Sequence, residues 1–192
     1  MMQLFYRMAV AGSRDCAQER SRSFVRADCA VRRPRVSLEY SSMRKVLIKT
    51  PALDPRHVCF DLSIRRSGIH RYGVYAVERI PANRKVIEYT GRRLNRKQAK
   101  HTDHTYLFTL DNYWSIDGAV GGSGAEIINH SCDPNLVSRI VRGHILYMSL
   151  RAIKPGEELT VDYNFSNDTD RQRCHCGARN CRGTIQNMEP ED

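Results

Sequence analysis

The sequence lacks a long apolar run, since nowhere do the roughly eighteen consecutive apolar residues of a membrane-spanning helix occur. Its first ten residues are apolar only in short, broken stretches, which is not typical of a secretory signal. Acidic residues are in short supply, because 31 lysines and arginines face 21 aspartates and glutamates for a net charge of +10. We therefore expect no membrane partner, and the basic excess favours docking on an acidic partner such as nucleic acid or chromatin.

An even set of spaced cysteines, the mark of a secreted disulfide framework, is also missing. The chain has seven cysteines, and three of them fall within eight residues near the C-terminus. This pattern predicts a reducing, intracellular compartment. We expect the nucleus or chromosome if the host is eukaryotic and the cytoplasm if it is bacterial.

Residues 1–42 differ in composition from the rest, because they contain eight arginines and no lysine. No sustained hydrophobic period runs through them. Such a composition also occurs in organellar targeting peptides. We favour a disordered basic extension.

The remainder reads as a mostly β domain built from many short strands and little helix. Polar residues 92–101 are expected to form a short exposed helix or a loop, and 125–128 one helical turn. The predicted strands are 58–64, 73–77, 85–89, 106–110, 113–116, 136–141, 144–150 and 159–163. Two pairs of them are expected to form hairpins, 106–110 with 113–116 and 136–141 with 144–150.

The C-terminal cysteines point to a metal. Cys174, Cys176 and Cys181 are too close for an unstrained disulfide between the first two, and thiolates at this spacing suit tetrahedral zinc. Zinc takes four ligands, so one more is needed. The candidates for it are Cys132, Cys59, Cys16, Cys29 and His175.

Two further polar blocks stand out, Asn129-His130-Ser131-Cys132 and Gly156-Glu157-Glu158-Leu159-Thr160-Val161-Asp162-Tyr163. Singly, each is as typical of ordinary structure as of a site. An Asn-His pair often caps a turn, a glutamate pair is usually a solvated turn, and a tyrosine at a strand end usually packs.

The ordered set is far more specific. Together with Glu88-Tyr89-Thr90-Gly91 and the cysteine cluster, it resembles the SET-domain family of protein lysine methyltransferases, with a post-SET zinc motif like that of Trithorax-type and Suv39-type members. The resemblance implies a SET domain at 58–165 and a post-SET module at 170–186. It also implies a β-clip fold of small curved sheets with a knot-like active site and a zinc-bound tail.

The resemblance further implies the function and its cofactors. The family transfers methyl groups from S-adenosylmethionine to a lysine side chain of a protein. Here we expect a histone tail if the host has chromatin and another basic protein if the host is microbial. It implies that Tyr163 and Tyr89 are catalytic and that Val161 and Phe165 line the substrate channel. The residues implied to bind the cofactor are His70, Arg71, Tyr72, Gly73, Tyr106, Asn129, His130 and His175. One structural zinc would be held by Cys132, Cys174, Cys176 and Cys181.

Two positions depart from the family pattern. Arg71 replaces the first glycine of a Gly-x-Gly turn, so that it must either keep an ordinary backbone conformation or crowd the cofactor pocket. Val161 stands where relatives carry Phe or Tyr that limits the number of methyl groups, and we expect more than one methyl to be added.

Other function classes fit parts of the sequence. A non-catalytic SET-like module that binds protein or chromatin would follow if Arg71 disables the cofactor pocket. A small basic zinc protein for nucleic acid would bind DNA in a strongly salt-dependent way. The presence of Asn129, His130 and Tyr163 argues against the first alternative, since a pure scaffold does not require all three.

Overall fold

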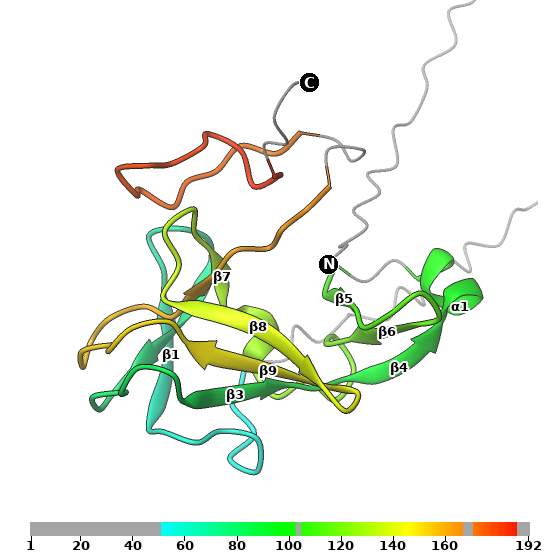
Figure 1. Ribbon diagram of the computed structural model, residues 1–192, viewed down its shortest axis with the longest axis horizontal. Helices are drawn as coiled ribbons and strands as arrows, with labels where there is room; N and C mark the ends of the chain where they lie inside the picture. Colours follow the sequence, from blue (N-terminus) through cyan, green and yellow to red (C-terminus); the bar gives the residue numbers. More distant parts are fainter. Residues whose placement is uncertain (1–50, 103–104, 167–170, 188–192) are drawn as a thin grey trace, which may run out of the picture. The chain divides into compact units, whose positions relative to one another are not determined.

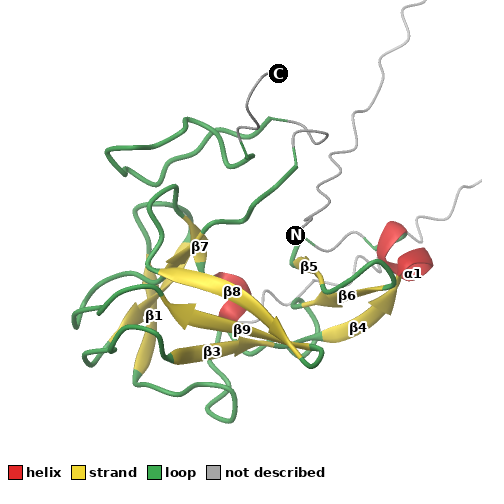
Figure 2. Cartoon of the chain, in the orientation of Figure 1, coloured by secondary structure: helices red, strands yellow, loops and turns green. Residues whose placement is uncertain are grey.

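The computed structural model describes residues 51–102, 105–166 and 171–187 of the 192-residue chain. The expected basic extension at 1–42 lies outside the described residues. Within them the chain is mostly β, as predicted (Figures 1 and 2). The elements are β1 (Leu62–Arg66), β2 (Tyr72–Ala76), β3 (Lys85–Tyr89), β4 (Arg92–Asn95), α1 (Arg96–Lys100), β5 (Leu107–Thr109), β6 (Trp114–Asp117), η1 (Ala125–Ile127), β7 (Asn129–His130), β8 (Leu136–Val141), β9 (His144–Ser149) and β10 (Thr160–Val161). No helix in these ranges is both long and apolar enough to span a bilayer.

The largest sheet has five strands in the order β3-β9-β8-β10-β7. The predicted hairpin at its centre is confirmed, since β8 and β9 pair antiparallel from Leu136 opposite Ser149 to Val141 opposite His144. Its two turn residues, Arg142 and Gly143, have φ values of 50° and 82°. Positive φ at both positions gives the tight turn whose twist matches that of paired strands.

A chain crossing within this sheet makes the knot-like arrangement. The short strand β10 lies between β7 and β8 and pairs with both in parallel, with Thr160 opposite Asn129 and Val161 opposite His130. The chain leaves β7 and enters β8 through residues 131–135, which therefore span β10 to reach its other side. Two polar blocks that are distant in sequence become direct neighbours in this way.

Two smaller sheets complete the fold, β1-β2 and β4-β6-β5. The predicted strand 58–64 is shifted, because β1 begins at Leu62 and Val58 makes only an isolated bridge to Ile87. The prediction of helix or loop for 92–101 was wrong in its first half. Residues 92–95 form β4, whose Leu94 is buried, and only the five residues after it form α1.

The core lies among the five-stranded sheet, β2 and η1. Its apolar side chains have at most 9% of their surface exposed. They include Val74, Ile80, Val86, Ile87, Tyr147, Ile153 and Leu159. Because these side chains come from nearly every strand, burying them fixes the register of the strands that carry polar site residues.

The tail at 171–187 has almost no regular structure of its own. Isolated bridges pair Phe165 with Gln186 and Arg173 with Thr184, and the Asn187 N–H donates to the Phe165 carbonyl at 2.8 Å. The predicted last strand, 159–163, is also shorter than expected, because only its second and third residues, Thr160 and Val161, pair as β10.

Candidate functional site

Asn129 on β7 ties the turn between β1 and β2 to the chain crossing. Its buried side-chain amide donates to the backbone carbonyls of His70 and Tyr72 at 3.3 and 2.9 Å. It also donates to the Glu158 carboxylate at 2.7 Å, so two amide hydrogens serve three acceptors. Three segments therefore meet at one side chain, which explains why a polar amide is buried here.

Glu158 is the shared acceptor at this junction. Its carboxylate also accepts the Ser67 hydroxyl at 2.8 and 3.0 Å and the Tyr75 hydroxyl at 2.9 Å. A Cβ on Gly73 would lie 2.2 Å from a Glu158 carboxylate oxygen, so no larger residue fits without displacing it. A glutamate pair is usually a solvated turn, whereas the crossing half-buries the Glu158 side chain among these donors.

Arg71 lies on the same turn with φ at 41°, in the left-handed region. Its backbone therefore does not keep an ordinary conformation, while crowding of the cofactor pocket, the other expected outcome, stays a prediction. Its side chain is exposed, and its backbone keeps the shape that a glycine would allow. A non-glycine residue in this region costs on the order of 1–3 kcal/mol.

His130 on β7 is buried and neutral. Burial lowers its pKa to about 4, helped by the Arg182 charge and opposed by Asp162. Its Nδ1 accepts the Tyr163 backbone N–H at 3.2 Å, so the proton of the neutral ring resides on Nε2. Nε2 lies 3.5 Å from the Cys132 sulfur, and the ring thus links Tyr163 to the cysteine cluster.

Asn135 fastens the crossing segment over β10. Its side-chain amide donates to the Glu158 carbonyl at 2.8 Å, and its side-chain oxygen accepts the Thr160 N–H at 2.9 Å. Only 3% of its surface is exposed, so these bonds are shielded from water. The sequence alone assigned Asn135 no role, because its two partners lie 23 and 25 residues away.

Tyr163 stands just after β10, against the ring of His130 at 5.3 Å and that of Phe165 at 5.3 Å. Its hydroxyl donates to the Ile128 carbonyl at 2.9 Å. Burial raises its pKa well above the usual tyrosine value, so the phenol stays protonated. Its oxygen therefore donates one hydrogen bond and keeps lone pairs that can accept another.

The other predicted aromatic residues differ in accessibility. Tyr89 has 5% of its surface exposed and packs at 5.4 Å from Phe108 and 6.1 Å from Tyr147. Its hydroxyl donates to the Tyr106 backbone carbonyl at 2.8 Å. The Tyr106 side chain is exposed, as is that of His175, whereas Val161 and Phe165 are buried.

The tail brings its three thiols to Cys132. The four sulfur atoms, of Cys132, Cys174, Cys176 and Cys181, lie within 4.8 Å of one another. Cys132 is 3.8 Å from Cys174 and 4.0 Å from Cys181. Zinc bound at about 2.3 Å by four sulfurs in a tetrahedron sets them about 3.8 Å apart, so the cluster fits zinc.

Backbone N–H groups already surround these sulfurs, as expected for thiolates. The donors are those of Cys132 to Cys176, of Cys176 to Cys174, of Arg182 to Cys132 and of Gly183 to Cys181, at 3.4 to 3.5 Å. Burial opposes ionisation of Cys176, but N–H donors from Cys132 and Ala178 outweigh it and lower its pKa to about 6. Of the fourth-ligand candidates, Cys132 completes the cluster, whereas Cys59 is exposed outside it; Cys16 and Cys29 lie outside the described residues.

An ion pair that the sequence analysis missed docks the tail beside Tyr163. Arg182 donates from both terminal nitrogens to the Asp162 carboxylate, at 2.6 and 2.9 Å. Burial opposes ionisation of Asp162, but these bonds outweigh it and hold its pKa below the usual value. The sequence contains an Asp-Tyr pair and an arginine directly after the last cysteine, but their spacing alone does not predict that Arg182 pairs with Asp162.

Comparison with known proteins agrees with this geometry. The pattern described as SET domain matches residues 71–164. The chain belongs to the SET-domain family. Its four-cysteine cluster is consistent with the post-SET module of that family.

The curated relatives are longer histone methyltransferases. The chain is 37% identical over 145 residues to histone-lysine N-methyltransferase ATX2 of Arabidopsis thaliana, covering 68% of this chain and 13% of that protein. It is 38% identical over 140 residues to the H3 lysine-4 specific histone-lysine N-methyltransferase of Candida albicans, covering 65% of this chain and 14% of that protein. The chain thus spans about one seventh of these relatives.

Solved structures share the fold. A complex of KRYPTONITE with mCHH DNA, an H3(1-15) peptide and SAH has a TM-score of 0.59 and 30% identity, covering 67% of this chain and 30% of that one. Arabidopsis thaliana SUVH6 with SAM has a TM-score of 0.62 and 26% identity, covering 68% of this chain and 34% of that one. The predicted mostly β SET fold is therefore confirmed.

Proposed function

We propose that this protein is a protein-lysine N-methyltransferase that uses S-adenosylmethionine (SAM) and acts on the tail of histone H3 in the nucleus. The observation that carries the proposal is the junction of Asn129, His130 and Tyr163 beside a four-thiol cluster. The curated relatives are named as histone-lysine methyltransferases, some as H3 lysine-4 specific, and solved relatives hold SAM, SAH or an H3 peptide.

SAM, when bound, supplies a methyl group on a positive sulfur. Asn129 holds the turn between β1 and β2 in one conformation, which presents that backbone to the cofactor. His130 fixes the start of the Tyr163 segment through its Nδ1. The residues that we propose contact the cofactor are His70, Arg71, Tyr72, Gly73, Tyr106, Asn129, His130 and His175.

The attacking group is a neutral lysine amine. A free lysine has a pKa near 10.4, so only about one in a thousand is neutral at pH 7. A channel lined by Tyr89, Val161 and Phe165 disfavours the ammonium form and lowers that pKa. The ammonium would lose its proton to solvent water, which leaves a nitrogen lone pair free for the methyl group that the cofactor would supply.

Tyr163 would aim this amine. Because its hydroxyl hydrogen is already donated to the Ile128 carbonyl, its oxygen can accept an N–H of the substrate. Accepting that bond turns the nitrogen lone pair toward the methyl group without adding a charge. Fixing both reactants in this way can supply several kcal/mol of the barrier, of order 7–11 at most.

Zinc at Cys132, Cys174, Cys176 and Cys181 would be structural. Four thiolates leave no open coordination position for a substrate or water. Its proposed role is to hold the tail, with His175 and Phe165, next to the cofactor and substrate channel.

Val161 would leave room for more than one methyl group. It is buried on β10, two residues before Tyr163, and a valine has no hydroxyl to hold a partly methylated amine. Wild-type protein is expected to yield di- or trimethyl-lysine, and Val161→Tyr mainly monomethyl-lysine. Mass spectrometry of an exhausted reaction measures this, and a purely monomethyl wild-type product would contradict it.

The first test measures SAM binding by calorimetry on zinc-loaded protein, followed by methyl transfer to an H3 peptide. Tyr163→Phe is expected to retain SAM binding and lower kcat by about 100-fold or more, because it loses one polar contact at the reacting centre. Asn129→Ala is expected to lose SAM binding, with thermal unfolding measured to separate this from misfolding.

A folded protein that binds no SAM would favour a non-catalytic function. Arg71 occupies a strained backbone position on the cofactor turn, which is the observation that favours a non-catalytic SET module. Wild-type protein that is folded and zinc-loaded but binds no SAM at millimolar concentration would support that module instead. The proposal also includes docking on nucleic acid through the basic charge, at residues other than those of the methyl-transfer site.

A further inference from the structure

The segment that forms β4 and α1 concentrates positive charge. Residues 92–101 contain five lysines and arginines and no acidic residue. Arg92 is paired with the buried carboxylate of Asp117 at 3.0 Å. The other four, Arg93, Arg96, Lys97 and Lys100, have exposed side chains.

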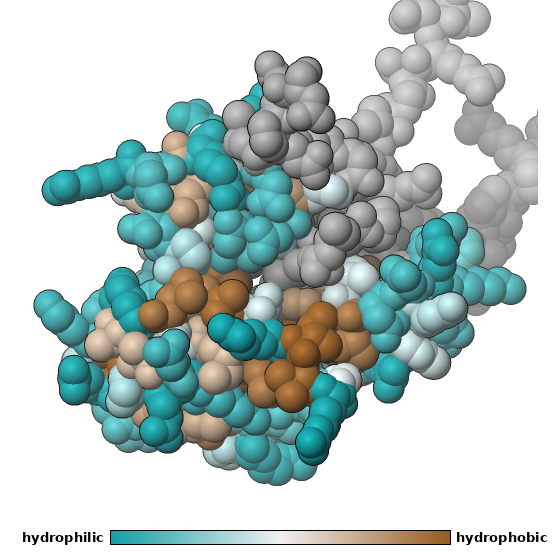
Figure 3. Space-filling view, in the orientation of Figure 1, coloured by the Kyte–Doolittle hydropathy of each residue, from teal (hydrophilic) through white to brown (hydrophobic). Residues whose placement is uncertain are grey.

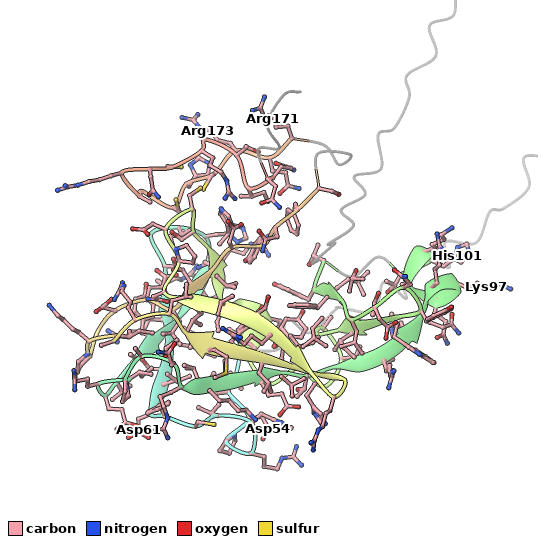
Figure 4. The ribbon with its side chains drawn as sticks, in the orientation of Figure 1. Asp54, Asp61, Lys97, His101, Arg171 and Arg173 are labelled. Atoms are coloured by element: carbon pink, nitrogen blue, oxygen red, sulfur yellow. The ribbon has the colours of Figure 1, made fainter. Side chains whose placement is uncertain are left out.

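The fold sets these cations beside two exposed aromatic rings. β4 pairs antiparallel with β6, which brings Asn95 opposite Trp114. The backbone N–H of Arg96 donates to the Tyr113 carbonyl at 3.0 Å, so α1 begins against the β5–β6 turn. In Figure 4 the labelled Lys97 and His101 project from α1 away from the sheets, and Figure 3 shows this end as hydrophilic.

The backbone of both aromatic residues is fixed, and the Trp114 ring is stacked. Tyr113 has 75% and Trp114 has 37% of its surface accessible. The Arg93 guanidinium stacks at 4.4 Å over the Trp114 ring. The Asp111 carboxylate accepts hydrogen bonds from the backbone N–H groups of both aromatic residues at 2.8 Å. These bonds fix the turn that carries the rings.

We propose that this surface, called the basic–aromatic surface, binds single-stranded nucleic acid. It consists of Arg93, Arg96, Lys97, Lys100, Tyr113 and Trp114. Phosphates would pair with the four cations, while a base stacks on the open face of Tyr113 and another on the Arg93–Trp114 pair. This inference goes beyond methyl transfer and does not depend on it.

Two features favour this ligand over other acidic partners. An acidic peptide would use the four charges but gives no reason for a highly exposed Tyr113. Duplex DNA hides its base faces, so it could use the cations and not the rings. A membrane surface is disfavoured because α1 carries Ala99 as its only apolar residue.

The test is fluorescence anisotropy of the full chain with a labelled oligo(dT) of about 20 nucleotides. With four cations engaged, log Kd is expected to rise with log salt with a slope of about 3. Tyr113→Ala should weaken binding about tenfold, the effect of one lost base stack. Lys97→Glu/Lys100→Glu should weaken it more than about tenfold, since two phosphate contacts become repulsive.

A matched control is Arg79→Glu/Lys154→Glu, which changes the net charge equally at two exposed sites beside the Ile80–Ile153 bridge. This control should bind almost as wild type does. Equal loss in both double variants, unchanged binding by Tyr113→Ala, or equal competition by duplex DNA or polyglutamate would each overturn the proposal. Methyl transfer to a free H3 peptide should not change in Lys97→Glu/Lys100→Glu, so failure of the two proposals can be told apart.

Discussion

The sheets and the C-terminal tail of this chain are stabilised in different ways. In the sheets, most of the fully buried side chains are apolar, among them Val74, Ile87 and Tyr147. In the described tail, 171–187, the buried residues are Cys174, Thr184 and Gln186. The tail therefore depends on cross-links between polar groups and sulfur atoms, while the sheets depend on the hydrophobic effect.

Folding of the sheets and docking of the tail beside the site are therefore separate steps. The sheets can place Asn129, His130 and Tyr163 without the tail, because their partners lie in the sheet region. The tail reaches that region through Cys132 and Asp162. Changes in the tail should therefore act on methyl transfer through the neighbours Cys132 and Asp162, and leave the stability of the sheets almost unchanged.

Removal of zinc should have the largest effect. Cys174→Ala, or excess chelator on the wild type, is expected to reduce zinc from about one ion per chain to near zero. Methyl transfer should fall more than about 100-fold, because even outer contacts of a metal site are worth 10–100-fold. The sheets should unfold at nearly the wild-type temperature.

Elemental analysis and thermal unfolding measure this prediction. Cys59→Ser is the control, since Cys59 is exposed and outside the cluster. Full zinc content in Cys174→Ala would show that the cluster is not the metal site.

A core truncation should show the reverse pattern. Ile153→Ala empties a fully buried position and is expected to lower the free energy of unfolding by about 2–5 kcal/mol. Zinc content of the folded fraction should stay at the wild-type level. Urea denaturation measures the first and elemental analysis the second, with exposed Val77→Ala as the near-neutral comparison. Loss of zinc from Ile153→Ala protein that is still folded would show that the tail and the sheets are not stabilised separately.

Arg182→Lys tests the ion pair between the two regions. Lysine keeps the charge but cannot donate two parallel bonds to Asp162, which should weaken tail docking by about 1–3 kcal/mol. Faster hydrogen exchange is expected at amides of 171–187, with little change in β8 and β9. Arg173→Lys, at an exposed position, serves as control, and equal protection in Arg182→Lys and wild type would argue that the ion pair contributes little.

The smallest effect is expected from Arg71→Gly. Glycine removes the strain of the left-handed backbone at φ 41°, which stabilises the folded state. The greater flexibility of glycine in the unfolded chain offsets part of that stabilisation. The net change in stability should be about 1 kcal/mol or less, and SAM affinity should change by at most about fivefold. Calorimetry measures the affinity, and Arg142→Gly relieves a similar φ of 50° in the β8–β9 turn as a control. A much larger gain in affinity would show that the Arg71 side chain obstructs the cofactor.

Local sequence was sufficient for most of the fold. Alternating apolar residues and the Arg142-Gly143 turn predicted β8 and β9, because pairing of adjacent segments depends on nearby residues. It failed at β4, where a polar segment becomes a strand because β6 offers it a partner. The two-residue strand β7 was also beyond local reasoning, since it exists through pairing with β10 about thirty residues later in the chain.

The site divides in the same way. The sequence by itself determined the residue types, and the ordered motifs were enough to name the family and the four cysteines. Only the tertiary structure decided that Glu158 points inward, that Asn135 fastens the crossing and that Arg182 joins Asp162. It also decided that the Arg71 backbone takes the glycine-like shape. These contacts depend on where the chain crosses itself, and the energy that fixes the crossing comes from burying apolar residues elsewhere in the sheets.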